Sequence, residues 1–178
     1  MENATRALAI AGGILIALLV VSLLVLGIGK LSSYYTAVDS AEYNKQIRDY
    51  NKQFETYNKN VVKGIELVSL CNLAEDTNND KYRDDYREIK LFVKPSDKGV
   101  LNEIFDEYKL SRSEDEYSEG EYYDLLYFYK TIYKQEKQNK NDDMTNKFER
   151  AYFDCDEIIY DDSNAKVKAL KFQEIYKR

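Results

Sequence analysis

An acidic stretch in the middle of the chain has the spacing of a calcium-binding loop. Four side chains fall at positions 1, 3, 5 and 9 of an EF-hand loop: Asp76, Asn78, Asp80 and Asp84. The match then fails, because Lys81 stands where the sharp turn needs glycine and Arg87 where a bidentate glutamate closes the site. We therefore expect a solvated, turn-forming loop here rather than a calcium site.

A second acidic group lies near the C-terminus. Its members are Asp154, Asp156, Glu157, Asp161 and Asp162. Such a group binds a divalent cation weakly in some proteins, but acidic residues on a strand and its turn more often form a charged edge that discourages pairing. We expect neither a metal ion nor a cofactor.

Several classes of catalytic site are excluded by composition. The chain has no histidine, which removes the commonest general base and every triad or zinc site that needs imidazole. It has 7 glycines and carries neither a Gly-rich phosphate loop nor a G-x-S-x-G nucleophile elbow. We therefore expect a protein that is not an enzyme.

Two cysteines, Cys71 and Cys155, lie on segments that we expect to pack together. In an oxidising compartment they would form one disulfide, closing a loop of roughly 84 residues and contributing about 4 kcal/mol to stability. The alternative is two buried thiols that act as small hydrophobic side chains.

An uncharged apolar segment, residues 7–29, follows a short tail, residues 1–6, and is flanked by Arg6 and Lys30. As a helix it is about 34 Å long, enough to cross a hydrocarbon core of roughly 30 Å, and we expect a transmembrane helix. The competing interpretation, a cleaved secretory signal, fits less well because the run exceeds the usual apolar region of such signals.

Small residues recur at every fourth position within the span: Ala9, Gly13 and Ala17. Such a stripe lets another helix approach closely in lipid, although stripes of this kind also arise by chance in spans rich in glycine and alanine. These three residues are the candidate positions for helix packing in the membrane.

A long amphipathic helix is predicted after a polar joint at residues 30–40. Its apolar positions, three or four residues apart, are Tyr43, Ile47, Tyr50, Phe54, Tyr57, Val61, Ile65 and Val68. This periodicity predicts a helix over residues 41–78 that packs on a core. Gly64 interrupts it, and we expect another element to approach the backbone closely there.

Residues 79–178 are expected to form a small domain. A run rich in β-branched and aromatic residues, 88–94, predicts a strand, and the apolar spacing of 100–110 predicts a short helix. A further helix is predicted over 121–136. Two strand-like runs, 152–160 and 166–175, flank an Asp/Ser/Asn turn and predict a C-terminal hairpin, with a bulge indicated near Ala169 and Leu170.

The predicted fold class is therefore α+β. A transmembrane helix continues into the long amphipathic helix, which packs on a small antiparallel sheet of about three strands with one or two short extra helices. The strand at 88–94 is expected to join the hairpin, because an isolated hairpin is only marginally stable.

Tyrosine is unusually frequent, with 17 residues and no tryptophan. One cluster comprises Tyr122, Tyr123, Tyr127 and Tyr129. Amphipathic packing at helix edges explains such a cluster, with rings buried and hydroxyls in water. The alternative is an exposed contact surface for a protein or a glycan.

Charge limits the partners. The chain has 26 Lys+Arg against 32 Asp+Glu, for a net charge of -6. Duplex nucleic acid binding depends on neutralising phosphates, so we expect no nucleic-acid partner. The expected partners are the lipid bilayer and other membrane or surface proteins, with self-assembly included.

The layout resembles that of the type IV pilin-like proteins. The resemblance rests on the N-terminal sequence MENATRALAIAGGILIALLVVSLLVLGIGK, on the amphipathic continuation and on the terminal hairpin. In that family the leader ends in glycine and the fifth mature residue is glutamate; here the fifth residue after Gly13 is Leu18, and after Gly12 it is Ala17. The sequence is also similar to small membrane-anchored proteins of low-GC Gram-positive bacteria.

The resemblance implies a non-enzymatic, single-pass membrane protein with an extracytoplasmic, pilin-like domain that acts as a structural or assembly subunit at the cell surface. An alternative is a membrane-tethered module that binds or senses a peptide or glycan. A further alternative is an accessory membrane protein that faces the cytoplasm.

Overall fold

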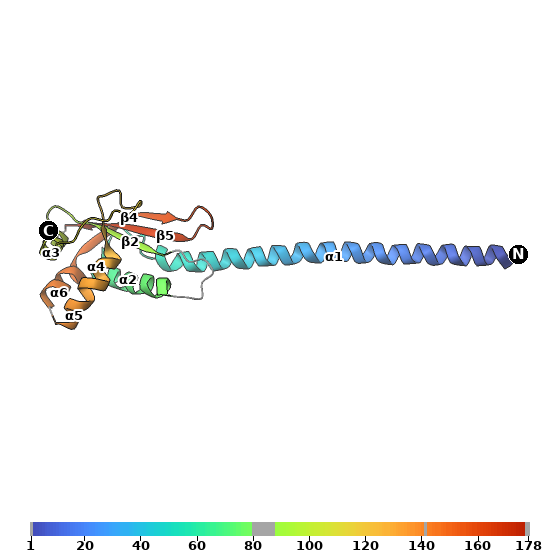
Figure 1. The fold of residues 1–178 in the computed structure, drawn as a ribbon, viewed down its shortest axis with the longest axis horizontal. Helices are drawn as coiled ribbons and strands as arrows, with labels where there is room; N and C mark the ends of the chain where they lie inside the picture. The colour runs from blue at the N-terminus through green and yellow to red at the C-terminus, as the bar shows by residue number, and fades with distance from the viewer. Residues whose placement is uncertain (1, 80–87, 141, 177–178) are drawn as a thin grey trace. The chain divides into compact units, whose positions relative to one another are not determined.

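The computed structural model describes residues 2–79, 88–140 and 142–176 (Figure 1). The chain is α+β, as the sequence predicts. It divides into two compact units, Met1–Gln46 and Ile47–Arg178, and each is described by itself.

The first unit is formed by helix α1, which spans Glu2–Glu55 and ends within the second unit. The polar joint predicted at 30–40 is wrong, because these residues continue the helix without a break. Their hydroxyl groups bond within the helix: Ser33, Thr36 and Ser40 each donate to the carbonyl four residues earlier, at 2.8–3.0 Å. A serine or threonine bonded in this way stays compatible with a helix, although it carries a polar side chain.

The long helix predicted over 41–78 is divided in two. Helix α1 ends at Glu55, where Asn58 N–H donates to the Glu55 carbonyl at 3.0 Å. Strand β1, Val62–Lys63, follows, and helix α2 spans Gly64–Asn79. The start of α2 is capped by Glu66, whose carboxylate accepts from Lys63 N–H at 2.9 Å. This bond is the glutamate half of a capping box.

Five strands form one sheet in the order β1-β4-β5-β2-β3. Besides β1, the strands are β2 (Lys90–Lys94), β3 (Tyr123–Asp124), β4 (Tyr152–Tyr160) and β5 (Val167–Ile175). The predicted C-terminal hairpin is present as β4 and β5, and β2 joins it as expected. However, β2 runs parallel to β5, so the sheet is mixed rather than antiparallel.

The register of the hairpin shifts in two places. One shift lies between Cys155 and Glu157 and the other between Ile159 and Tyr160. Ala169 and Leu170 pair with Ile159 and Ile158, but the next pair is Val167 with Tyr160, so the register skips Lys168. The second shift therefore lies next to Ala169, close to where the sequence indicates a bulge. Alternation also fails at Ala169 and Leu170 because β5 is buried on both faces, and the two side chains belong to different apolar clusters.

Helices cover one face of the sheet. Figure 1 shows α2, α4, α5 and α6 gathered on the same side. The bounds after α2 are α3 (Val100–Glu107), α4 (Leu125–Phe128), a π-helical turn (Tyr129–Tyr133), α5 (Lys134–Gln138) and α6 (Asp142–Arg150). The helices predicted over 100–110 and 121–136 are therefore present, the second with a π turn inside it. Helix α6 is not predicted by the sequence.

The main core lies between these helices and the sheet. Its largest fully buried side chains are aromatic and come from four helices and two strands: Phe54, Phe105, Phe128, Phe148, Phe153 and Phe172. Phe128, Phe148 and Phe153 form a chain of tilted ring contacts with centroids 5.3 and 5.9 Å apart. Such contacts add to the hydrophobic gain from burial.

Two glycines permit close contacts in this core. A β-carbon at Gly64 would lie 1.8 Å from the Phe148 carbonyl oxygen, so α2 starts directly against the backbone of α6. The expectation that another element approaches Gly64 is confirmed. At Gly99 a β-carbon would lie 1.8 Å from Glu174 Oε2. Glu174 is buried on β5 and accepts from Leu101 N–H at 3.3 Å, which caps α3 from outside the helix.

The end of α1 is bound to the turn between β4 and β5. Asn51 Nδ2 donates to the Ala165 carbonyl at 2.8 Å, and Val167 N–H donates to Asn51 Oδ1 at 2.9 Å. Tyr50 Oη donates to the Val167 carbonyl at 3.3 Å. The Asn51 side chain thus bonds to the backbone of both Ala165 and Val167, on either side of Lys166.

Replacing Gly64 by alanine is expected to destabilise residues 47–178 by about 3 kcal/mol, since the new methyl group must displace backbone rather than a flexible side chain. Chemical denaturation of the full chain in detergent measures this loss. Ser69→Ala, at an exposed position of the same helix, serves as the control and should change stability by no more than about 0.5 kcal/mol. A Gly64→Ala variant as stable as the parent would contradict the close α2–α6 contact.

Candidate functional site

The second face of the sheet is covered by residues 111–122, which we call the acidic strap. Its backbone hydrogen bonds close on the strap itself: Ser113 N–H donates to the Tyr122 carbonyl at 2.8 Å, and Ser118 N–H donates to the Asp115 carbonyl at 3.0 Å. Ser118 is completely buried. The strap is thus a compact loop with its ends close together.

Lysines of the sheet bind the strap through side chains. Lys90 and Lys94 of β2 pair with Asp115 and Glu121, respectively. On β5, Lys171 pairs with Glu119 at 3.3 Å. Lys168 of β5 donates to the hydroxyl of Tyr117. Each of these contacts joins a basic strand position to a polar side chain of the strap.

Two tyrosine rings lie among these lysines. Lys90 and Lys168 lie 5.3 and 4.7 Å from the centre of the Tyr117 ring. Lys94 and Lys171 lie 5.9 and 5.5 Å from the centre of the Tyr122 ring. A small apolar cluster lies between the strap and the sheet. It contains Phe92, Tyr122 and Ala169, with Tyr117 and Ile159 packed against it. Cation–π attraction therefore supplements the ion pairs.

Lys171 is the most buried of the four lysines, with 4% of its surface exposed. It also pairs with Glu157 of β4 at 2.8 Å. Burial alone would lower the pKa of Lys171, but its bonds to Glu157 and Glu119 raise the pKa above the usual value. Because a buried cation without a partner is costly, the strap and β4 keep Lys171 charged.

The strap carboxylates are shifted in the opposite direction. Partial burial would raise the pKa of Asp115, but hydrogen bonds from Lys90 Nζ and Tyr117 N–H hold it below the usual range. The hydrogen bond from Lys94 similarly lowers the pKa of Glu121. Both carboxylates are therefore better ionised in the attached strap than in a free one.

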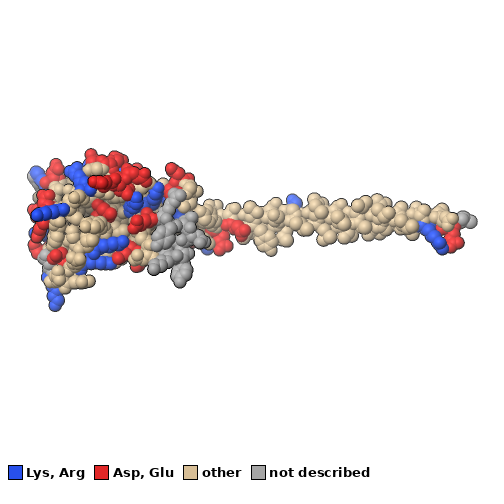
Figure 2. Space-filling view, in the orientation of Figure 1, with Lys and Arg blue, Asp and Glu red and all other residues tan. Residues whose placement is uncertain are grey.

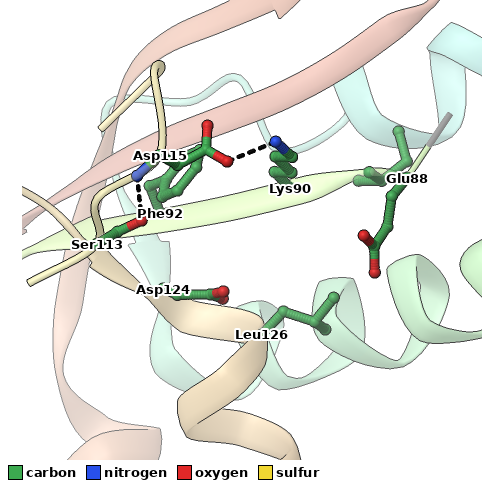
Figure 3. A pocket seen from close by; sticks show the side chains of 8 residues that line it. Glu88, Lys90, Phe92, Ser113, Asp115, Asp124 and Leu126 are labelled. Atoms are coloured by element: carbon green, nitrogen blue, oxygen red, sulfur yellow. Dashed lines mark hydrogen bonds and ion pairs between the residues drawn. The ribbon is translucent and has the colours of Figure 1, made fainter. Parts of the chain in front are cut away.

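A pocket of about 270 Å³ lies where the strap crosses β2 (Figure 3). Its polar lining comprises Glu88, Lys90, Ser113, Asp115 and Asp124, and its apolar lining Ile89, Phe92 and Leu126. Figure 3 shows the Lys90–Asp115 ion pair at one side of the pocket and Asp124 beside Leu126 at the other. The lining is thus mainly acidic, with one lysine already paired.

Asp124 also has a structural role in this pocket. Its carboxylate caps α4 by accepting from Tyr127 N–H at 2.8 Å. Desolvation by neighbouring atoms raises the pKa of Asp124 despite this bond, and the negative charge of Glu88 acts in the same direction. Asp124 therefore acts as the N-cap of α4, although its surroundings disfavour the ionised carboxylate.

A second pocket, of about 410 Å³, lies between the end of α3 and the helical segment 125–138. It is lined by Tyr108, Lys109, Leu110, Ser111, Tyr127, Thr131 and Ile132. Tyr127 keeps 55% of its surface exposed. Aromatic, hydroxyl and basic groups thus meet at one surface depression.

The four tyrosines predicted as a contact surface are not together on the surface. Tyr122 is buried at the end of the strap with its hydroxyl donating to Asp156, and Tyr129 is buried with its hydroxyl donating to Asn72 at 2.5 Å. Tyr123 is half-buried against Phe105. Only Tyr127 of the four is exposed, so the contact-surface interpretation is wrong for the cluster as a whole.

Both cysteines are free thiols. Cys71 is completely buried on α2, where desolvation raises its pKa, and Cys155 is half-buried on β4. Burial raises the pKa of Cys155 to about 11, with Asp154 and Asp156 acting in the same direction. The structure thus has the arrangement of the second alternative, small hydrophobic thiols, and neither thiol has a reactive environment.

The other predicted positions are distributed as follows. Ala9, Gly13 and Ala17 lie on α1, and a β-carbon at Gly13 would meet no atom within 4 Å. Of the EF-hand-like residues, Asp76 and Asn78 lie at the end of α2, whereas Asp80, Lys81, Asp84 and Arg87 lie outside the described residues.

Three of the five C-terminal acidic residues make contacts inside the fold: Asp156 accepts from Tyr122, Glu157 pairs with Lys171, and Asp161 accepts from Ser163 N–H at 2.8 Å. Within residues 2–79, 88–140 and 142–176, no cluster of three or more carboxylates or thiols is arranged to hold a metal ion. The strap was missed by local sequence patterns, although a lysine stands at each end of β2 and an acidic run follows α3.

The chain was compared with models of protein families, with curated proteins and with solved structures. None of the three comparisons found a match.

Acidification is expected to release the strap before it unfolds the sheet. Because the pKa values of Asp115 and Glu121 are lowered, their stabilising contribution is present above the free carboxyl pKa of about 4 and is lost as the pH falls through the lowered values. Hydrogen exchange, corrected for intrinsic rates, should show protection falling in 111–122 below about pH 4 while β4 and β5 stay protected.

The double variant Asp115→Asn, Glu121→Gln should show the same loss of protection at neutral pH. Glu114→Gln, Glu116→Gln is the matched control, because both glutamates are exposed on the same strap. Equal protection in the parent and the double variant at neutral pH would contradict an electrostatic attachment.

Proposed function

We propose that this protein is a non-enzymatic, single-pass membrane protein whose α+β unit lies outside the cytoplasm and serves as a structural or assembly subunit at the cell surface. The observation that supports the proposal is the apolar segment of α1. Its side chains are exposed throughout the unit that contains them, and α1 is the one helix in the described part of the chain that is long and apolar enough to cross a membrane.

Exposed apolar area makes water an unfavourable surrounding for this segment. Leu8, Ile16 and Leu26 expose 77%, 68% and 64% of their surfaces. Each such side chain would gain about 1.5–3 kcal/mol on leaving water. Figure 2 shows a long stretch of α1 without charged groups. A bilayer covers such a segment, and the helix satisfies its own backbone hydrogen bonds there.

The residues that follow the span fit the boundary of a membrane. Lys30 comes directly after the apolar run, and Tyr34 and Tyr35 follow one turn later with exposed rings. Basic residues and tyrosines are enriched at the level of the lipid headgroups. We therefore propose a bilayer boundary near Lys30, and we call residues 31–46 of α1, which follow it, the stalk.

Self-assembly is supported by an apolar face on the stalk. Leu31, Tyr34 and Val38 recur three and four residues apart and expose 53%, 63% and 41% of their surfaces. Ser33, Thr36 and Ser40 lie on the opposite face of the helix. In a membrane all copies of a single-pass protein share one orientation. The apolar faces of neighbouring copies therefore lie at the same height above the bilayer and can contact one another.

The orientation outside the cytoplasm rests on the pilin-like layout. Arg6 and Lys30 flank the span almost symmetrically, so positive charge gives little preference. The net charge of a long domain does not prevent its translocation. A second candidate function, a tethered module that binds a peptide or glycan, is favoured by the pocket at Tyr108 and Tyr127.

Membrane anchoring is expected to persist in alkaline carbonate, which releases peripheral proteins. The double variant Leu18→Arg, Leu19→Arg should instead enter the soluble fraction, since each arginine costs about 2.5–3.5 kcal/mol at the centre of a span. Ser33→Arg, Thr36→Arg is the control outside the span and should stay in the membrane. Release of the parent chain by carbonate would refute the anchor.

Orientation is measured with single cysteines introduced on either side of the span. Lys98→Cys, at an exposed position, should react with a membrane-impermeant thiol reagent in intact cells, whereas Asn3→Cys should react only after lysis. The native thiols should contribute little background because both are shielded and have raised pKa values. The reverse pattern would establish the cytoplasm-facing alternative.

Assembly is tested by disulfide cross-linking in the membrane. Leu31→Cys and Val38→Cys should form covalent dimers under mild oxidation, whereas Ser33→Cys and Ser40→Cys, on the opposite face, should form few. Equal yields at the four positions would indicate random collision and would favour the tethered-module alternative.

A further inference from the structure

The four lysines under the acidic strap form a compact basic surface. Lys90 and Lys94 lie on β2, and Lys168 and Lys171 lie on the neighbouring strand β5. In the parallel register Lys90 is opposite Ala169, and Phe92 is opposite Lys171. Adjacent strands lie about 4.8 Å apart, so like charges gather here around an apolar centre. We call this surface the lysine face.

Each of the four lysines has one polar side chain of the strap as a partner. Asp115, Glu119 and Glu121 each pair with a different lysine, and Tyr117 accepts from the fourth. The backbone of the strap closes on itself, so the strap is attached to the lysine face mainly by side chains. Detachment therefore breaks no backbone bond of the sheet, and it is a local opening that exposes the amides of the strap to solvent.

We propose that the lysine face is a docking surface for an acidic, aromatic-bearing peptide segment of a partner protein, and that the strap occupies it as a tethered competitor. The strap itself defines what the surface accepts: carboxylates at the spacing of Asp115, Glu119 and Glu121, with a tyrosine or similar ring at the position of Tyr117.

Charge complementarity and the apolar centre together favour a peptide over a simple polyanion. The Tyr117 ring packs against the cluster of Phe92 and Ala169 while two ammonium groups approach it. A polyanion without aromatic groups would pair with the lysines but leave this apolar cluster in contact with water. A peptide that carries both kinds of group replaces every contact of the strap.

A tethered strap has an effective concentration in the millimolar range, so a free peptide competes poorly with it. The experiment therefore weakens the strap first. The triple variant Asp115→Asn, Glu119→Gln, Glu121→Gln removes the carboxylates that pair with the lysines and leaves the lysine face unchanged. The probe is a fluorescent synthetic peptide with the sequence of residues 111–122, and anisotropy is measured with the full chain in detergent.

The peptide should bind the triple variant at least about tenfold more tightly than it binds the parent chain, because the competitor is weakened. Binding should weaken as salt rises, since the contacts are ionic. Adding Lys90→Gln and Lys168→Gln to the triple variant should abolish binding. Circular dichroism and hydrogen exchange in β4 and β5 establish that each variant is folded.

Three results would overturn the proposal. One is a folded triple variant whose strap exchanges as slowly as that of the parent, since the strap would then not be held by these charges. Another is an open strap with no peptide binding up to about 1 mM, the scale of the lost effective concentration. The third is equal affinity for polyglutamate, which would show recognition of charge alone.

Discussion

Asn51 connects the last turns of α1 to the hairpin on which the sheet is built. Its amide oxygen accepts from Val167 N–H and its amide nitrogen donates to the Ala165 carbonyl, so both ends of one side chain are satisfied by the turn after β4. Ile47, Tyr50 and Phe54 pack beside it. Since β5 pairs with both β4 and β2, the orientation of this turn constrains three strands at once.

The two faces of the sheet are stabilised by different physical interactions. One face carries the aromatic core beneath the helices and depends on burial of apolar area. The other carries the lysine face and the acidic strap, where ion pairs and cation–π contacts surround a small apolar cluster. Solvent conditions that screen charge therefore act on one face of the sheet and leave the other largely unchanged.

The sequence predicts the elements whose signals are local and strong. The apolar run of α1 and the hairpin around residues 161–165 are examples, because composition and turn residues define them without distant partners. The break after Glu55 was missed because Val61 and Ile65 continue the helical spacing across it. Helix α6 was missed because Met144 and Phe148 are its main apolar residues within a polar run.

The candidate site was less predictable than the fold, because its contacts join residues far apart in the chain. Tyr122 looks like one member of an aromatic cluster in the sequence, yet its hydroxyl contacts Asp156 and its ring lies beside Lys171. The parallel pairing of β2 with β5 decides which lysines become neighbours. The spacing of residue types within one strand does not show which other strand lies beside it or in which direction that strand runs. Alternation along a single strand indicates only which of its own side chains share a face.

The π turn at Tyr129–Tyr133 adds one residue to the helical segment 125–138. Tyr129 and Tyr133 lie at the two ends of this turn and are both buried in the core, with their ring centroids 5.6 Å apart. Downstream, Lys134 reaches Glu75 and Lys137 reaches Glu149 at 2.6 Å. A π turn is closed by i→i+5 bonds, so its five residues rotate the chain about as far as four residues of an ordinary α-helix do. A one-residue deletion within 129–133 would therefore restore α-helical geometry and leave α5 close to its present orientation relative to α2 and α6. A change of one residue in length is thus better tolerated in this turn than at other points of the helical segment, where it would rotate the following residues by about 100°.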